Sequence, residues 1–304
     1  MRESSRLVVL NTGPSSFLRR VAGVTVAGIF VVLVAPHGTT KADSQQYSVV
    51  ARVDAQSAGP TLRDIVVRVE NVSVAATAIN ASPTDIPRNI AIVMDTGPDQ
   101  AKVLSQEKDL AIALINELSD AGTSFIIASA GASQKMQAAT LDQSVAIEHI
   151  REITEDNGEK TDVPIYDAIG SAIRQISTTP GLRVVIFIGE GNDGGSRLRY
   201  PGLRNLAESH HIACFAALIA DHSLRGTKSI LRYGWNLQEL TADTAGIFLE
   251  NQKTLKATQR LNESVRGLRL ITFEMPFRGP GRYKISVLSP RGKTLRAQKA
   301  VTIP

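Results

Sequence analysis

A short apolar segment that ends in an acidic residue constrains this chain more than any other feature. Residues 90–94, Ile-Ala-Ile-Val-Met, are apolar and partly β-branched; Asp95 follows them, and Gly97-Pro98 breaks the pattern. This pattern predicts a strand buried on both faces, whose carboxyl end brings the Asp95 carboxylate to the edge of a sheet. Ligands of open α/β sheets bind at that edge. The chain therefore has to fold around a sheet with a polar carboxyl edge.

Strand-like and helix-like segments alternate through the middle of the sequence. Apolar residues recur at helical spacing, for example at Leu110, Leu114 and Leu118. We predict strands at 90–94, 124–128, 183–188, 212–219 and 246–250, and helices at 106–118, 145–153, 165–176, 203–208, 237–243 and 252–265. This alternation predicts an α/β fold with a Rossmann-like, mostly parallel sheet and helices on both faces.

Segments rich in β-strand patterns flank the α/β region. Turn residues and alternating apolar residues mark both flanks. We therefore predict four parts: a signal peptide at 1–42, a β-rich N-terminal segment at 43–87, the α/β domain at 88–266 and a β-rich C-terminal segment at 267–304. The two β-rich segments could together form a small antiparallel unit beside the α/β domain.

The first 42 residues have the pattern of a secretory signal. Arg19-Arg20 ends a polar region, residues 21–35 are apolar but too short to span a bilayer comfortably, and Thr40-Lys41-Ala42 is an acceptable cleavage site. The pattern predicts a secreted, periplasmic or cell-envelope protein. An uncleaved leader that serves as an anchor is the alternative, and it is the only membrane association that we expect.

The basic character of the chain belongs largely to this leader. The formal net charge is +5, but without the first 42 residues the chain holds 29 basic and 28 acidic residues. A nearly neutral remainder argues against a nucleic-acid partner. Cys214 is the only cysteine of the sequence, lies in an apolar run and is expected to be buried; the chain can form no intrachain disulfide.

Four motifs, in order along the chain, resemble those of the von Willebrand factor type A domain. They are Asp95-Thr-Gly-Pro-Asp99, Val163-Pro-Ile-Tyr-Asp-Ala-Ile169, Val184-Val-Ile-Phe-Ile-Gly-Glu-Gly-Asn-Asp-Gly-Gly-Ser-Arg197 and Asn236-Leu-Gln-Glu-Leu-Thr-Ala-Asp-Thr-Ala-Gly246. The sequence is most similar to the secreted, VWFA-related bacterial group abundant in acidobacteria, over about residues 65–304. The resemblance implies a von Willebrand A-like fold and a role in binding or adhesion through the loops at the carboxyl ends of the strands.

The same resemblance implies where a metal-ion-dependent adhesion site would lie. The family surrounds Mg²⁺ with oxygens from an Asp-x-Ser-x-Ser loop, a threonine and an aspartate. Here Asp95 matches, Gly97 and Asp99 replace the serines, Val163 replaces the threonine and Glu190 replaces the aspartate. Because Mg²⁺ demands oxygen ligands in octahedral geometry, these replacements predict a degenerate site.

Two interpretations of this edge stay open. In the first, the domain is a metal-independent scaffold without a cofactor. In the second, Asp95, Asp99 and Glu190 form a carboxylate cluster that binds Ca²⁺ or Mg²⁺. Under either interpretation the predicted binding face, which would engage a macromolecular and most simply a protein partner, comprises Asp95, Thr96, Gly97, Asp99, Val163, Glu190 and Asp193.

Other motifs in the sequence indicate little chemistry. Gly189, Gly191 and Gly194 satisfy a dinucleotide-binding spacing, but the third glycine is followed by another glycine and no helix is predicted to start there. The sequence has no Gly-x-Ser-x-Gly motif. We therefore predict that the protein is not an enzyme, and we keep an exported hydrolase with Asp and Glu as acid and base as a further alternative.

A basic segment near residue 230 is a candidate second contact surface. Residues 224–233 are expected to form a basic loop, and the only tryptophan, Trp235, follows it. Arg232, Tyr233 and Trp235 are residue types that often anchor interfaces. A half-buried tryptophan ring that closes a helix N-terminus is the structural alternative.

Overall fold

The parallel sheet forms the centre of the α/β region, as the buried apolar strands predict. The computed structural model describes residues 46–53, 65–80, 86–98, 102–131, 134–155, 163–219, 228–289 and 294–303, without the side chains of Asn80 and of residues 228–233. Within these ranges a six-stranded sheet consists, in spatial order, of β6 (Lys135–Met136), β5 (Thr123–Ala130), β4 (Arg88–Asp95), β7 (Leu182–Gly189), β8 (Ile212–Leu218) and β9 (Phe248–Glu250). Every residue of β4 is buried, as expected for a central strand covered on both faces.

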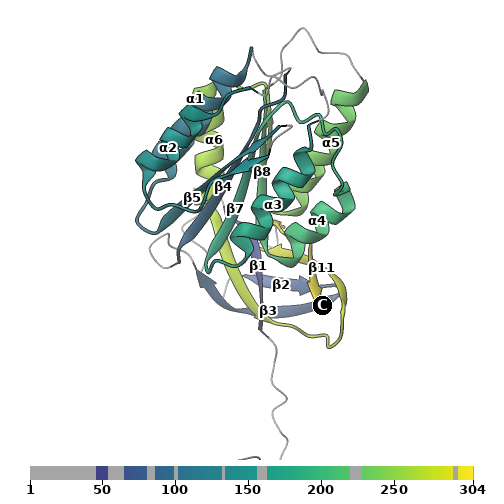
Figure 1. Cartoon of the computed structure of the whole chain (residues 1–304). Helices are drawn as coiled ribbons and strands as arrows, with labels where there is room; N and C mark the ends of the chain where they lie inside the picture. The colour runs from purple at the N-terminus through teal and green to yellow at the C-terminus, as the bar shows by residue number, and fades with distance from the viewer. Residues whose placement is uncertain are drawn as a thin grey trace, which may run out of the picture. The chain divides into compact units, whose positions relative to one another are not determined.

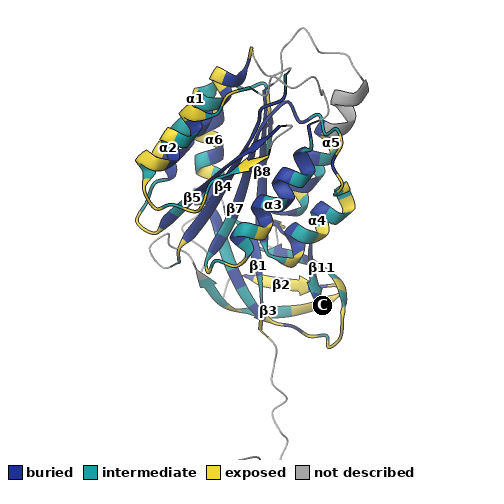
Figure 2. Ribbon diagram, in the orientation of Figure 1, coloured by how far each residue is buried: buried dark blue, intermediate teal, exposed yellow. Residues whose placement is uncertain are grey.

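The helices cover the two faces of this sheet (Figure 1). Side chains of a strand alternate between faces, and those of β4 divide accordingly. Ile90, Ile92 and Met94 share a hydrophobic cluster with α1 (Leu104–Leu118), α2 (Gln143–Glu152) and α6 (Thr254–Arg266). Ala91 and Val93 share the other cluster with α3 (Ile165–Ser177), α4 (Tyr200–Ser209) and α5 (Lys228–Asp243). In Figure 2 the central strands β4, β7 and β8 are largely dark blue, whereas α1 and α2 turn exposed residues outward.

The order of the strands defines the fold class. In chain order the six strands occupy the positions 3-2-1-4-5-6, and only the edge strand β6 runs antiparallel to its neighbour. This is the order of doubly wound nucleotide-binding sheets, in which ligands bind where the order reverses. The predicted Rossmann-like, mostly parallel sheet with helices on both faces is therefore confirmed, and the reversal lies between β4 and β7.

The flanking β-rich segments meet in a second, antiparallel sheet. Its spatial order is β12 (Arg296–Ala297), β1 (Gln46–Arg52), β10 (Leu268–Glu274), β3 (Val72–Asn80), β2 (Val66–Val69), β11 (Gly281–Leu288) and β13 (Ala300–Ile303). Residues 294–303 bond to β11 on one side, and part of them bonds to β1 on the other. The sheet thus closes into a barrel around a core that includes Val67, Phe273 and Val287.

Some element boundaries differ from those predicted. The prediction of a basic loop at 224–233 is wrong for residues 228–233, because α5 begins at Lys228 and not at 237. Residues 224–227 lie outside the described ranges. Helix α4 begins at Tyr200 and includes Pro201, which fits the first turn because its missing N–H would have no partner there. The strand that the alternating apolar pattern predicts at 295–301 is split between β12 and β13.

The predicted signal peptide, residues 1–42, lies outside the described residues. Of the helices that the structure describes, none combines the length and the apolarity needed to cross a bilayer.

Candidate functional site

Three separate segments meet at the carboxyl ends of β4 and β7. After β4, the Thr96 N–H donates to the Ala130 carbonyl at the end of β5, at 2.8 Å. The segment before α3 pairs with the loop after β7 through a parallel bridge between Val163 and Asp193. The Gly194 N–H also donates to the Val163 carbonyl at 2.9 Å. The predicted binding-face residues that are described therefore lie together where the strand order reverses.

The Asp95 carboxylate is enclosed by main-chain donors. Its Oδ1 accepts the Gly97 N–H at 3.0 Å, and the N–H groups of Glu190 and Gly191 also donate to the carboxylate. Only 2% of Asp95 is exposed. Burial, with a smaller contribution from the Glu190 charge, raises the pKa of Asp95 to about 7. Asp95 therefore joins the loops after β4 and β7 and presents little of its carboxylate to solvent.

The space beside Asp95 is filled by an apolar side chain. A Cβ atom placed on Gly97 would lie 2.5 Å from Val163 Cγ2 and 3.3 Å from Asp95 Oδ1. Val163 is buried. The position that resembles the family's first serine thus has no room for a side chain, and a methyl group of Val163 lies next to it.

No set of three His, Cys, Asp or Glu side chains among the described residues is arranged to hold a metal ion. Asp99, the third member of the predicted carboxylate cluster, lies outside the described residues. Glu190 is buried, and its charge contributes to the raised pKa of Asp95. The cluster of Asp95, Asp99 and Glu190 stays a prediction.

A buried acid that the sequence analysis missed lies beneath this edge. Glu107, in the first turns of α1, is 0% exposed, and neither carboxyl oxygen has a hydrogen-bond partner among the described residues. Burial, followed by the charges of Asp95 and Glu190, raises the pKa of Glu107 well above its ordinary value. The signal was present in the sequence, because residue 107 falls on the helical stripe that continues through Leu110 and Leu114.

Asp193 holds the glycine-rich loop onto α3. Its carboxylate accepts the Tyr166 N–H at 3.0 Å and the Ser196 hydroxyl proton. In return, the Asp167 carboxylate accepts the Arg197 N–H at 2.9 Å. Since α3 has no side-chain cap of its own, Asp193 caps it from another loop. Asp193 is half-buried, and burial raises its pKa.

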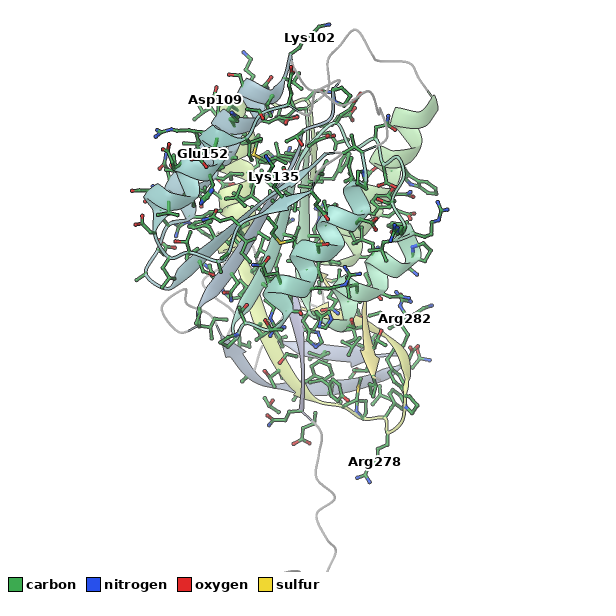
Figure 3. The ribbon with its side chains drawn as sticks, viewed as in Figure 1. Lys102, Asp109, Lys135, Glu152, Arg278 and Arg282 are labelled. Carbon is green, nitrogen blue, oxygen red and sulfur yellow. The ribbon has the colours of Figure 1, made fainter. Side chains whose placement is uncertain are left out.

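A polar groove of about 420 Å³ lies beside Thr96. Its wall includes Lys135 and Glu152, both labelled in Figure 3, and His149. His149 Nδ1 lies 3.5 Å from Glu152 Oε2. The carboxyl edge therefore has a concave surface with charges of both signs, next to the loops after β4 and β7.

The predicted interface anchors lie on a helix and not on a loop. Helix α5 contains all three of them, Arg232, Tyr233 and Trp235. The structure does not describe the side chains of Arg232 and Tyr233. Trp235 is 59% exposed and lies inside α5, so it does not close the N-terminus of this helix as the structural alternative had it. An exposed tryptophan remains available for a contact.

Comparisons with known proteins find similarity in fold only. No protein-family model and no curated protein matches the sequence. An aerotolerance-related membrane protein of Bacteroides fragilis matches 58% of this chain and 98% of its own, at 15% identity and a TM-score of 0.48. BatB of Bacteroides thetaiotaomicron matches 58% and 96%, at 17% identity and a TM-score of 0.48. The von Willebrand domain of the pilus tip protein Mfa5 of Porphyromonas gingivalis matches 36% and 39%, at 14% identity and a TM-score of 0.32.

Proposed function

We propose that this protein is an exported, non-enzymatic binding protein that engages another protein through the carboxyl edge of its parallel sheet, without a metal ion. The contact surface consists of the loop after β4, the loop after β7 and the segment before α3. The predicted binding face supplies it: Asp95, Thr96, Gly97, Asp99, Val163, Glu190 and Asp193. The secretory pattern of residues 1–42 supports export, and the resemblance to a degenerate, VWFA-related domain supports binding.

The contact between Gly97 and Val163 carries the metal-independent part of this proposal. A metal site of the family type needs oxygen ligands at both positions, and here a glycine packs against a methyl group. Main-chain N–H groups also engage the Asp95 carboxylate, as a cation would. The loops are thereby held in place by hydrogen bonds and apolar packing.

A divalent-cation-dependent binder is the second candidate, and Glu107 favours it. A fully buried carboxyl that has no hydrogen-bond partner in the described part of the chain, close to two other buried acids, is a costly arrangement that a cation would relieve. Ca²⁺ accepts variable geometry and several carboxylates. In that case Asp95, Asp99 and Glu190 would be its ligands.

The melting temperature of the full chain in EDTA, and then with Mg²⁺, Mn²⁺ or Ca²⁺, separates the two candidates. An ion at a hundredfold excess over its dissociation constant adds roughly 2.7 kcal/mol to the free energy of unfolding. We expect no shift with any ion, either in the wild type or in Asp95→Ala. A rise in the wild type that Asp95→Ala abolishes would establish the cation-dependent candidate.

Site-specific photocrosslinking tests the binding surface. A photoreactive residue replaces Asn192, in the loop after β7, and in a control it replaces Ser73, an exposed residue of the barrel. We expect protein adducts from position 192, and none from position 73, when the full chain meets cell-envelope extracts in EDTA. Adducts at position 73 alone, or adducts at 192 only after a divalent cation is added, would contradict the proposal.

A further inference from the structure

A second cavity lies between the α/β region and the barrel, and it shares no residue with the carboxyl edge. Its volume is about 590 Å³, within the range of roughly 300–1,000 Å³ of ligand pockets. The wall comes from the last turns of α5, from the start of β9 and from β11 and β12. These elements bring together residues far apart in the sequence, such as Phe248 and Leu295.

The lining combines apolar surface with positive charge. Phe248, Ile285 and Leu295 supply the apolar part, and among the described residues of the lining the charged ones are Arg296 and Lys299. Lys299 Nζ lies 2.9 Å from Asp243 Oδ1, which offsets its charge. Arg296 is exposed, and no ion pair joins it to the described residues. The cavity therefore offers an arginine to an incoming carboxylate.

One wall of the cavity includes residues at the open edge of the parallel sheet. In the described part of the chain β9 is the last strand, and only β8 pairs with it. The Ala216 N–H donates to the Ile247 carbonyl, and the Asn251 N–H donates to the Leu218 carbonyl. Because bonding alternates along a strand, the N–H and C=O groups of the residues between, Phe248 and Glu250, point away from β8. Gln252 Nε2 donates to the Glu250 carbonyl at 3.3 Å, and the other outward groups can bond to an added strand.

We propose that this cavity is a docking groove for an extended peptide that carries an acidic side chain and adds to β9 as a further strand. The main chain of the peptide bonds to the outward N–H and C=O groups of Phe248 and to the outward N–H of Glu250, as in other cases of strand addition. Its apolar side chains cover Phe248 and Leu295, and its carboxylate lies against Arg296. The surface is independent of the carboxyl edge and binds a different partner segment.

Fluorescence anisotropy of the full chain with a labelled hexapeptide of alternating glutamate and valine tests this proposal. We expect saturable binding, and no binding of the matched peptide of alternating lysine and valine. Arg296→Gln should weaken binding at least about fivefold, since it removes one charge-assisted contact. Circular dichroism shows whether each variant keeps the wild-type fold.

A matched pair at Glu250 tests the strand addition itself. Glu250→Pro removes one outward N–H without breaking the bonds to β8, whereas Glu250→Ala keeps that N–H. We expect the proline variant to bind the glutamate–valine peptide about tenfold more weakly, and the alanine variant to bind as the wild type does. Equal binding by both variants, equal binding of both peptides, or no binding of the glutamate–valine peptide at millimolar concentration would overturn the proposal. Binding of sodium laurate in place of the peptide would also overturn it, and would make the groove a small-molecule site.

Discussion

The buried carboxyl of Asp95 makes the stability of this protein depend on pH in a direction that can be calculated. In the folded chain burial raises its pKa from 3.8 to about 7. Between these two values the unfolded chain has released the proton, while the folded chain still holds it. Since the unfolded state then binds fewer protons, the free energy of unfolding falls as pH rises through this window.

The magnitude follows from the size of the shift. Each pKa unit corresponds to about 1.36 kcal/mol, so a shift from 3.8 to about 7 amounts to roughly 4 kcal/mol lost between pH 4 and pH 8. Asp95→Asn abolishes the titration and keeps the shape of the side chain. Any hydrogen bond that it weakens changes stability by an amount that does not depend on pH, so the difference between wild type and variant isolates the ionisation.

Urea unfolding in EDTA, followed by far-ultraviolet circular dichroism at intervals from pH 4 to pH 8, measures this difference. Fluorescence is a poor probe, because Trp235 is 59% exposed in the folded state. We expect the stability of the wild type relative to Asp95→Asn to fall steadily with pH. Because Glu107 and Glu190 interact with Asp95, the midpoint belongs to the cluster as a whole. A difference that is constant with pH, or that grows, would mean that main-chain donors keep Asp95 ionised, and would refute the reasoning.

Three further substitutions test single contacts through the free energy of unfolding. Glu107→Leu should stabilise the protein by about 1–3 kcal/mol at pH 7, because it removes an unpaired buried carboxyl; the gain should shrink at pH 4, and equal gains at both values would contradict the raised pKa. Arg282→Ala should cost roughly 1.5–3 kcal/mol, since Arg282 donates to the fully buried Glu208 at 2.7 and 2.8 Å while Arg204 stays 4.0 Å from it; Arg282→Lys should lose less, and an equal loss would rule out the charge as the cause. Gly97→Ala should cost about 1–3 kcal/mol through contact with Val163, and Val163→Ala in the same chain should restore part of that; simple additivity would show that the two side chains do not meet.

Much of the α/β region could be predicted because its strands are buried on both faces. Such strands appear in the sequence as continuous apolar runs, and residues 183–188 lie within β7 (Leu182–Gly189). The first half of α5 was missed for the opposite reason: residues 228–233 carry lysine, serine and arginine, which mask an apolar stripe. Hydrophobic periodicity predicts only the part of a helix in which apolar residues recur on one face.

The closure of the barrel depends on pairings that no local pattern encodes. The sequence predicted strands in both flanking segments and an antiparallel unit made from them. Residues 294–303 bond both to β11 and to β1. These pairings join segments far apart in the sequence and depend on packing in the barrel core, which includes Phe273 and Val287. Pattern analysis identifies strands more readily than their partners.

At the candidate site, the sequence identified the positions but not how they are filled. Comparison with the family motif predicted Gly97, Val163 and Glu190 at the carboxyl edge of the sheet, where the structure also has them. It could not show that a Val163 methyl lies where a side chain of residue 97 would be, because that contact joins loops from distant parts of the chain. Glu107 was missed because an acid on a helical stripe is ordinarily read as surface charge.

The pairing of β1 with β10 has a consequence for the order in which the protein is assembled. Ser48 and Thr272 lie opposite each other across this ladder, although 224 residues separate them in the chain. Bringing such distant residues together is entropically costly unless the intervening chain is already compact. The α/β sheet can form first and shorten that distance, so that the barrel closes last. During synthesis the barrel therefore cannot close before residues 294–303 are available, and removing either β1 or these residues would prevent its closure.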